Sequence, residues 1–342
     1  TVDQADLASL TVTPPANYAG DFDLTMTVTS TDTGDTAGDT DTATDDAVAL
    51  VMALRNSDID VLGISTVAGN CTIEQATQNA LYTQNLVGST VPVHVGAAGP
   101  LMRDLQSAHH VHGQDGMGDI GLELHSREPA SYRGVQALID AIMDNPGEIE
   151  LVTLGPLTNL ALALRLEPGI IDSVKRVVSM GGTAILPGNV TALAEFNFWA
   201  DPESAYIVAN SGLQWEMAGW DISTAHAVIH DELAAELRRV GMLGAFAMDI
   251  QAVLREFCRN ETMLDGFDLP DPLAMAIAIE PTIVTREAHH FVDIISGDGP
   301  ARGQTIVDER GNSGREPNCR VIYEVDRERF LELLHASLTD SP

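Results

Sequence analysis

Four aspartates lie within eight consecutive positions, directly before an apolar segment, at Asp39, Asp41, Asp45 and Asp46. One aspartate is enough to cap a helix, and a second is common in the first turn, where the helix dipole favours negative charge. Further carboxylates repel their neighbours unless a cation neutralises them, and such hard oxygen ligands suit Ca²⁺ or Mg²⁺. The spacing therefore favours a metal site over helix capping alone.

Other candidate ligands lie further along the chain, each in a turn after an expected strand or before an expected helix. They are Asn70, Leu154 through its backbone carbonyl, Asn189, Glu195, Asn197 and Asp271. In doubly wound sheets, ligands bind outside the carboxyl ends of the strands. Each residue alone is a weak signal, because Asp-Pro helix starts and polar surface loops are common. Together they indicate one site that gathers acids and amides.

An alternation of apolar strands and helices, from residue 45 onward, must position these residues. Strands are expected at 59–67, 91–96, 149–155, 174–182, around Phe291 and at 319–325. Helices are expected at 47–54, 72–87, 156–166, 202–212, 272–279 and 327–338. Repeated strand–helix units are typical of a parallel sheet covered by helices. We therefore predict an α/β fold, a single domain with a mainly parallel central sheet flanked by helices.

The first 36 residues differ from the rest, because they are rich in Thr, Asp and Gly and alternate in the manner of a strand. They resemble one strand pair of the Ig-like repeats of large secreted bacterial adhesins, or form an N-terminal extension of uncertain structure. The main domain is expected at 37–342. The segment "TSTDTGDTAG" at 29–38 is too polar for a central parallel strand. We therefore expect either that residues 24–30 supply the first strand, or that foreign sequence has been joined here.

The composition is strongly acidic, with 50 acidic residues against 18 basic ones, a net charge of −32 and a single lysine, Lys175. This is typical of a protein from a halophile, because concentrated salt screens self-repulsion. The alternative is an acidic surface at ordinary salt, and both disfavour nucleic acid and anionic membranes as partners. Three widely spaced cysteines, no signal-like start and no apolar run of about 20 residues predict a reduced, cytoplasmic protein.

Several motifs occur in an order that identifies a family. "DTDTATDDA", "TVAGN", "GPLTNLAL", "AEFNFWADPE" and "DPLA" together resemble the inosine–uridine-preferring nucleoside hydrolases, over residues 39–335. The resemblance implies a calcium-dependent enzyme of nucleoside salvage that hydrolyses the N-glycosidic bond of ribonucleosides to free base and ribose. It also implies a homo-oligomer, a dimer or a tetramer.

The resemblance further implies roles for the candidate residues. Asp41, Asp46, Asp271 and the carbonyl of Leu154 would bind Ca²⁺, with the ribose hydroxyls and one water completing its shell. Asp45 would be the general base on that water, and Asp39 would orient the ligands from behind. The remaining residues would grip the ribose and stabilise an oxocarbenium-like sugar: Asn70, Asn189, Glu195 and Asn197. Met180 would line the ribose pocket or belong to the core at a strand end.

One departure from the family concerns the leaving group. Many members carry His before the late aspartate, as "HDPLA", where it is a proposed acid for the departing base. Here that position is Pro270, which has no proton to donate. His112, in "HHVHGQDGMG", is a candidate replacement or else a solvated loop histidine, and Tyr132 and Trp220 are further possibilities. The preferred base, purine or pyrimidine, stays open.

Two other functions fit parts of the sequence. "DTDTAT" imitates the nucleophile motif of haloacid dehalogenase-type phosphatases, but Lys175 precedes its strand rather than following it. A non-enzymatic calcium-binding surface module would explain residues 1–40 and leave the following 300 unexplained. Neither accounts for "GPLTN" and "AEFN".

Overall fold

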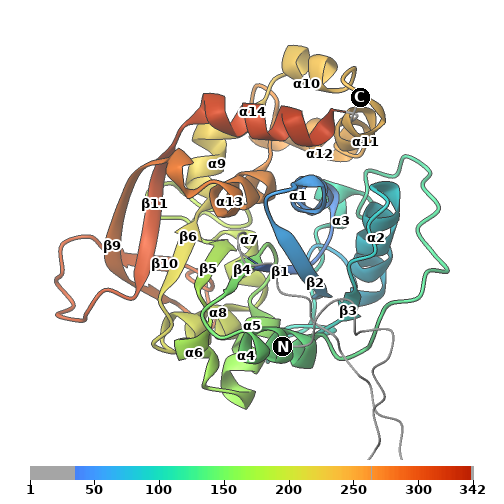
Figure 1. Ribbon diagram of the computed structural model, residues 1–342. Helices are drawn as coiled ribbons and strands as arrows, with labels where there is room; N and C mark the ends of the chain where they lie inside the picture. Colours follow the sequence, from blue (N-terminus) through green and yellow to red (C-terminus); the bar gives the residue numbers. More distant parts are fainter. Residues whose placement is uncertain (1–34, 263, 340–342) are drawn as a thin grey trace, which may run out of the picture.

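The computed structural model describes residues 35–262 and 264–339, and its centre is a twisted nine-stranded sheet (Figure 1). The strand order is β10-β9-β11-β6-β5-β4-β1-β2-β3. The seven strands β11, β6, β5, β4, β1, β2 and β3 run parallel to one another, and β9 and β10 form an antiparallel edge next to β11. The strands are β1 (Asp35–Thr40), β2 (Asp60–Thr66), β3 (Val93–Val95), β4 (Ile149–Thr153), β5 (Arg176–Met180), β6 (Trp215–Ala218), β9 (Val284–Ile294), β10 (Thr305–Asp308) and β11 (Cys319–Val325).

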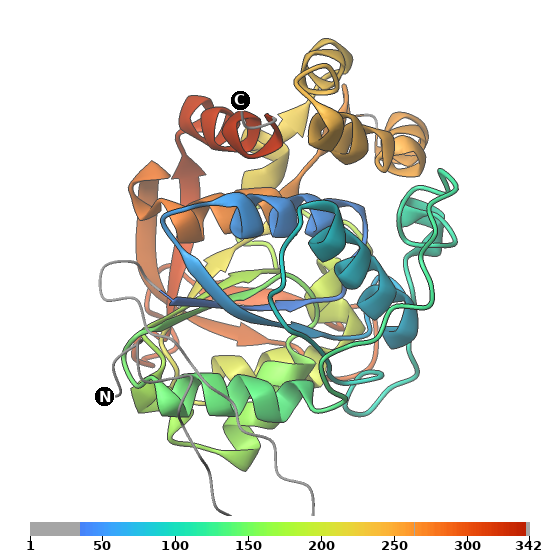
Figure 2. The ribbon, with the colours of Figure 1, turned by 45° about the vertical axis from the view of Figure 1, so that its right-hand side comes forward.

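Helices cover both faces of the sheet, as the two views show (Figures 1 and 2). One face carries α1 (Thr44–Arg55), α2 (Ile73–Leu86), α13 (Pro270–Ile279) and α14 (Arg327–Leu338). The other carries α4 (Gly134–Asp144), α5 (Thr158–Leu166), α6 (Ile170–Ser173) and α8 (Pro202–Ala209). The short α3 (His109–His112) and α7 (Phe196–Ala200) lie in loops after strands, and the 3₁₀-helix η3 (Pro281–Ile283) leads into β9.

The apolar strand segments explain this layering. Successive side chains of a strand point to opposite faces, and in β4 Leu151 and Val152 are fully buried in two different core clusters. Strands that are apolar on both faces belong between two helical layers. The expectation of a mainly parallel α/β sheet flanked by helices is confirmed, and the helices and strands expected after residue 45 are present.

The expectation that the segment before Asp39 is too polar for a central parallel strand was wrong. Residues 24–30 lie outside the described residues, and the joining of foreign sequence stays a prediction. The polar residues themselves form β1, which pairs in parallel with β2 on one side and with β4 on the other. Its backbone therefore pairs within the sheet on both sides, and two of its side chains suit a central position: Ala37 packs into the core, and Asp39 accepts a hydrogen bond from Asn159. Helices cover both faces of the sheet, and a central strand with such side chains tolerates a polar sequence. The proposed Ig-like repeat lies outside the described residues.

A separate helical segment, for which the sequence pattern predicted no elements, follows β6. It contains α9 (Trp220–His226), β7 (Val228–Ile229), α10 (Asp231–Leu237), α11 (Met242–Asp249), α12 (Ala252–Phe257), the π-helical η2 (Cys258–Thr262) and β8 (Phe267–Asp268). Strands β7 and β8 pair as a small antiparallel ribbon, and α10 to α12 lie beyond α13 and α14, at one end of the molecule (Figure 1). Within the described part of the chain, no helix is long and apolar enough to cross a bilayer.

Candidate active site

A pocket opens at the carboxyl ends of the central strands, and its volume is about 850 Å³ when the open space at its mouth is included. Loops after β2, β4 and β5 contribute to it, together with the starts of α1 and α13. Its inner end is polar and acidic, whereas its outer end is lined by side chains from α3, α9 and α12. We call the acidic part the carboxylate floor: Asp45, Asp271 and Leu154 line the pocket, and Asp41 and Asp46 are buried directly next to them. We call the other part the apolar wall (Val111, Trp220, Leu254, Phe257, Leu264 and Pro270).

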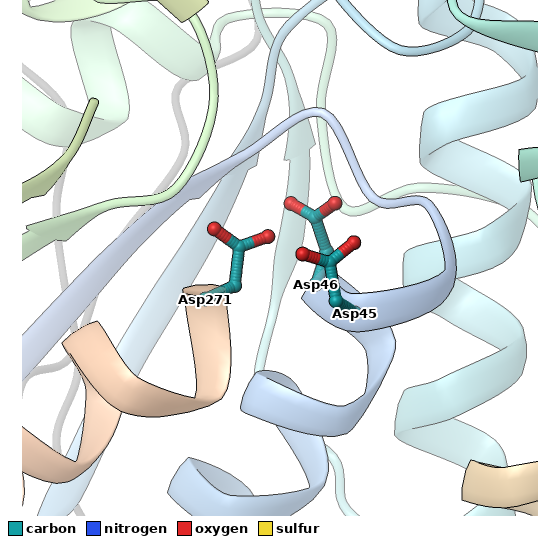
Figure 3. A group of neighbouring side chains, drawn as sticks. All are labelled: Asp45, Asp46 and Asp271. Atoms are coloured by element: carbon teal, nitrogen blue, oxygen red, sulfur yellow. The ribbon is translucent and has the colours of Figure 1, made fainter. Parts of the chain in front are cut away.

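Three carboxylates of the floor converge from two helix N-termini. Asp45 and Asp46 lie in the first turn of α1, and Asp271 lies in the first turn of α13, facing them (Figure 3). One oxygen from each lies within 4.8 Å of the others, and all three side chains are buried. The first turn of a helix is where the backbone dipole favours anions, so both helices help to hold the charge.

Helix capping accounts for one of these acids only. Asp46 accepts hydrogen bonds from the Ala43 backbone N–H at 2.9 Å and from the Thr40 hydroxyl at 2.6 Å, and so serves the N-terminus of α1. By contrast, Oδ1 of Asp45 accepts no hydrogen bond from the residues that the structure describes. The cluster thus holds more carboxylate oxygen than the helix start uses.

Asp41 joins the floor beside Asp46. Its Oδ2 accepts the backbone N–H of Asn70 at 2.6 Å, while Oδ1 is buried without a hydrogen-bond partner among the described residues. A Cβ on Gly69 would lie 2.1 Å from Oδ2, and one on Gly155 would lie 2.8 Å from Oδ1. Both glycines therefore leave the space that this carboxylate occupies, which gives the "AGN" and "LGP" motifs a physical reason.

The electrostatics of the floor are those of crowded acids. Burial, followed by repulsion from Asp46, raises the pKa of Asp45 to about 8, and the same two causes raise the pKa of Asp41. For Asp271, burial and then the charges of Asp45 and Asp46 raise the pKa. A buried carboxylate is expensive to ionise unless a positive charge is close. None of the groups shifting these values is cationic.

A hard cation fits this donor set. Two buried carboxylate oxygens, on Asp41 and Asp45, have no hydrogen-bond partner among the described residues, and the oxygens of Asp45, Asp46 and Asp271 lie close together. All candidate donors are oxygens, which is the set that Ca²⁺ and Mg²⁺ prefer. The acidic cluster could therefore hold a metal ion.

The loop after β5 forms a second polar part of the pocket. Glu195 is buried, and its carboxylate accepts the backbone N–H groups of Gly182 and Asn197, each at 2.8 Å. Burial nevertheless raises its pKa to about 7. The Asn197 side chain donates to the Leu154 carbonyl at 2.8 Å and to the Met180 carbonyl at 3.2 Å. This network ties the ends of β4 and β5 to α7.

The other expected residues fall into two groups. Asn70, Met180 and Asn189 line the pocket, so Met180 belongs to the pocket as well as to the end of β5. Asn189 also accepts the Phe196 N–H at 2.9 Å. Asp39 lies behind the floor, does not line the pocket and contacts Asn159 at 2.7 Å. Burial raises the Asp39 pKa to about 7.

His112 is buried at the pocket edge, so its interpretation as a solvated loop histidine was wrong. Its Nδ1 lies 2.7 Å from the Thr44 hydroxyl and 3.9 Å from Oδ1 of Asp45. Burial, with smaller contributions from His110 and His109, lowers its pKa to about 3, which makes the imidazole neutral at pH 7. Tyr132 is 75% exposed and lies outside the pocket, whereas Trp220 lines it.

Sequence reasoning missed most of the outer pocket. The apolar wall and the nearby Asp268 come largely from α9, α12 and β8, whose residues form no ordered motif. Asp268 had one available signal: it is an acid inside the apolar run "GFDLPDPLAMA", three positions before Asp271. The apolar residues had none, since core and pocket side chains of this kind look alike in sequence.

The fold and the pocket define an α/β enzyme with its acidic site at the carboxyl edge of a mainly parallel sheet. The sequence model of the inosine-uridine preferring nucleoside hydrolase family matches residues 37–332, so the chain belongs to this family. It is 35% identical over 291 residues to the pyrimidine-specific ribonucleoside hydrolase RihB of Escherichia coli O139:H28, covering 85% of this chain and 92% of that protein.

Solved structures agree with this assignment. A plant nucleoside hydrolase, the PpNRh1 enzyme, superposes with a TM-score of 0.84 at 31% identity, covering 90% of this chain and 99% of that one. A purine-preferring ribonucleoside hydrolase from Gardnerella vaginalis gives a TM-score of 0.82 at 30% identity, with coverages of 89% and 98%. The similar proteins thus include pyrimidine-specific and purine-preferring enzymes.

Proposed function

We propose that this enzyme hydrolyses the N-glycosidic bond of ribonucleosides in a calcium-dependent reaction that releases free base and ribose. The observation that carries the proposal is the buried carboxylate floor, with unpartnered oxygens on Asp41 and Asp45, at the inner end of a pocket with apolar walls. The polar end suits a sugar with hydroxyl groups, and the apolar end suits a flat heterocycle.

Asp41, Asp46, Asp271 and the Leu154 carbonyl would hold Ca²⁺. When bound, the cation would anchor the ribose hydroxyls and lower the pKa of a water molecule. The Leu154 carbonyl already accepts one hydrogen bond from Asn197, which leaves its second lone pair for a ligand. Asp39, behind the floor, would keep the ends of β1 and α5 in place through Asn159.

Asp45 would take the proton of the attacking water. It lines the pocket, it carries an unpartnered oxygen, and it is the floor carboxylate that we do not assign as a metal ligand. His112 and Thr44 lie against one another next to it, so the neutral imidazole would fix the Asp45 side chain or act directly on the leaving base.

Asn70, Asn189, Glu195 and Asn197 would bind the ribose, with Met180 packed beneath it. A carboxylate close to C1′ stabilises the positive charge that develops as the glycosidic bond breaks more than it stabilises the neutral substrate. Glu195 is suited to this because its backbone donors hold it rigidly in place.

The two other functions considered from the sequence find less support. A phosphatase of the haloacid dehalogenase type would not need the Glu195–Asn197 network. A calcium-binding surface module would not need a pocket of this size with an apolar wall. Membership of a nucleoside hydrolase family also counts against both.

We infer three further properties from the composition and the family: an origin in a halophile, a location in the cytoplasm and assembly into a homo-oligomer. The net charge of −32 suits a halophile's cytoplasm, and thermal stability should then rise steeply with KCl. The enzyme should form a homo-oligomer, either a dimer or a tetramer. Light scattering in molar KCl measures the molar mass and so gives the number of subunits. A stability that falls with added KCl would contradict the halophilic inference.

The test of the proposed function is ribose release from inosine, adenosine, uridine and cytidine in molar KCl, with and without a calcium chelator. We expect release that the chelator abolishes and that added Ca²⁺ restores. The ranking of the four nucleosides establishes the base preference. Folded, calcium-loaded protein that releases ribose from none of them would overturn the proposal.

A further inference from the structure

The outer end of the pocket must supply a proton as well as a surface. When the C1′–N bond breaks, its electron pair stays on the base, and a base that leaves as an anion in an apolar site is strongly disfavoured. Pro270, at the position where the sequence suggested a donor, has none. The titratable side chains lining this end, among the described residues, are His110, His112, Cys258 and Asp268.

Asp268 lines the pocket together with the apolar wall. It is the last residue of β8, it lines the pocket, and only 6% of it is exposed. Its Oδ2 accepts the Ser223 hydroxyl at 2.8 Å, and the Trp220 side chain donates to the same carboxyl group. Two donors from α9 therefore fix the orientation of the carboxyl group against the apolar wall.

Asp268 is also within electrostatic reach of the floor. When ionised, Asp268 is one of the groups that raise the pKa of Asp45. It does not belong to the close group of Asp45, Asp46 and Asp271, however, and it is not assigned to the metal. The pocket thus holds one carboxyl group apart from the close group of the floor, and glycoside hydrolysis uses two carboxyl groups, one as base and one as acid.

Burial acts oppositely on the two proton donors that could replace the missing histidine. It raises the pKa of Asp268, because a charged carboxylate is disfavoured away from water. It lowers the pKa of His112 to about 3, so the imidazolium form is lost. The same apolar surroundings therefore favour a carboxylic acid over a histidine as the proton donor.

We propose that Asp268 is the general acid that protonates the departing base. This inference rests on the proposed nucleoside hydrolysis. The Asp268 carboxyl proton moves to the base as the C1′–N bond breaks, and the electron pair of that bond stays on the base. Water forms the new C1′–O bond and loses its proton to Asp45. A proton then returns from Asp45 to Asp268 through solvent, so that one nucleoside and one water yield one base and one ribose.

The test compares two kinds of leaving group in Asp268→Asn. Nucleosides need a proton on the base, whereas 4-nitrophenyl β-D-ribofuranoside releases a phenolate that is stable without one. We expect kcat/KM for uridine and inosine to fall by about 100- to 10,000-fold. We expect the value for the nitrophenyl riboside to change by less than about tenfold, because its leaving group gains little from an acid.

Two control variants accompany this measurement. Asp265→Asn changes an exposed carboxyl in the same segment and should leave both substrates unaffected. His112→Gln should lower kcat/KM for both kinds of substrate by the same factor if His112 only positions Asp45. If Asp268→Asn does not fold, Asp268→Ser, which keeps a hydroxyl acceptor for Ser223, should give the same selective loss.

The outcomes separate this proposal from the proposed function. Wild-type enzyme inactive on every riboside would overturn the hydrolase proposal and Asp268 with it. If the wild type is active and Asp268→Asn loses activity equally on both kinds of substrate, or on neither, the acid role alone is overturned. Selective loss of nucleosides in His112→Gln instead would assign the proton to His112.

Discussion

The carboxylate floor and the apolar wall of the pocket are built in different ways. The floor comes from short motifs at strand ends and helix starts, which the parallel sheet brings together along one edge. The wall comes from a helical segment outside the sheet, with α12 contributing Leu254 and Phe257. The floor is thus tied to the sheet and, on the proposed function, would serve every riboside, whereas the wall would meet the base.

The largest effect is expected from Asp45→Asn, which tests whether the floor serves every substrate equally. Removing a general base costs about 100- to 10,000-fold in turnover, and we expect this loss on nucleosides and on the nitrophenyl riboside alike. Calcium affinity, measured by titration calorimetry, should fall little. Asp41→Asn should weaken calcium binding instead, and if the two variants exchange these behaviours, Asp41 is the base.

The floor should also make stability depend on pH and calcium together. Burial first, and then for Asp45 repulsion from Asp46, raises the folded-state pKa of Asp39 and Glu195 to about 7 and of Asp45 to about 8. These values exceed those of the unfolded chain, so the folded state holds extra protons between pH 4 and 8. The stability that these groups contribute is full at low pH and is lost as the pH rises through 7 to 8.

Calorimetric melting from pH 5 to 8 checks this dependence. With chelator, the melting temperature should fall as the pH rises. Added Ca²⁺ favours the ionised carboxylates, so the shift that it produces should grow with pH, and ligand at about 1,000 times its Kd adds about 4 kcal/mol. Asp45→Asn should flatten the slope. A calcium shift that is equal at pH 5 and pH 8 would contradict the assignment of these carboxylates to the site.

The contrast between floor and wall also explains what the sequence could predict. Asp41, Asn70, Glu195 and Asn197 were identifiable because hard ligands and amides at strand ends have few other reasons to cluster. The roles assigned to them remain predictions. Phe257 was not identifiable, since an aromatic residue in a helix is most often core. The error at β1 arose because the pattern of a strand was judged without the two neighbours that pair with it.

A smaller effect is expected from Asn197→Ala, which separates the scaffold of the floor from its chemistry. The variant leaves the buried carbonyls of Leu154 and Met180 without their donor, at a cost of about 1–3 kcal/mol in the free energy of unfolding. The activation free energy of turnover should rise by a similar amount, and calcium affinity should fall too. Asn210→Ala, which removes an amide at the end of α8, should affect only stability. Unchanged calcium affinity in Asn197→Ala would separate Leu154 from the metal.

The smallest effect is expected at the wall, from Phe257→Ala. The Phe257 ring lines the pocket and meets the His110 ring edge-on, with centroids 5.7 Å apart. Losing an apolar contact with the base costs about 1.5–3 kcal/mol at most, and less where water refills the space. We expect kcat/KM to fall about tenfold, with the ranking of purine and pyrimidine nucleosides changed and calcium affinity preserved. Tyr132→Ala removes an exposed aromatic ring outside the pocket and should change neither. An equal loss of kcat/KM on all four nucleosides would mean that Phe257 supports the floor, and the assignment of α12 to base recognition would then be wrong.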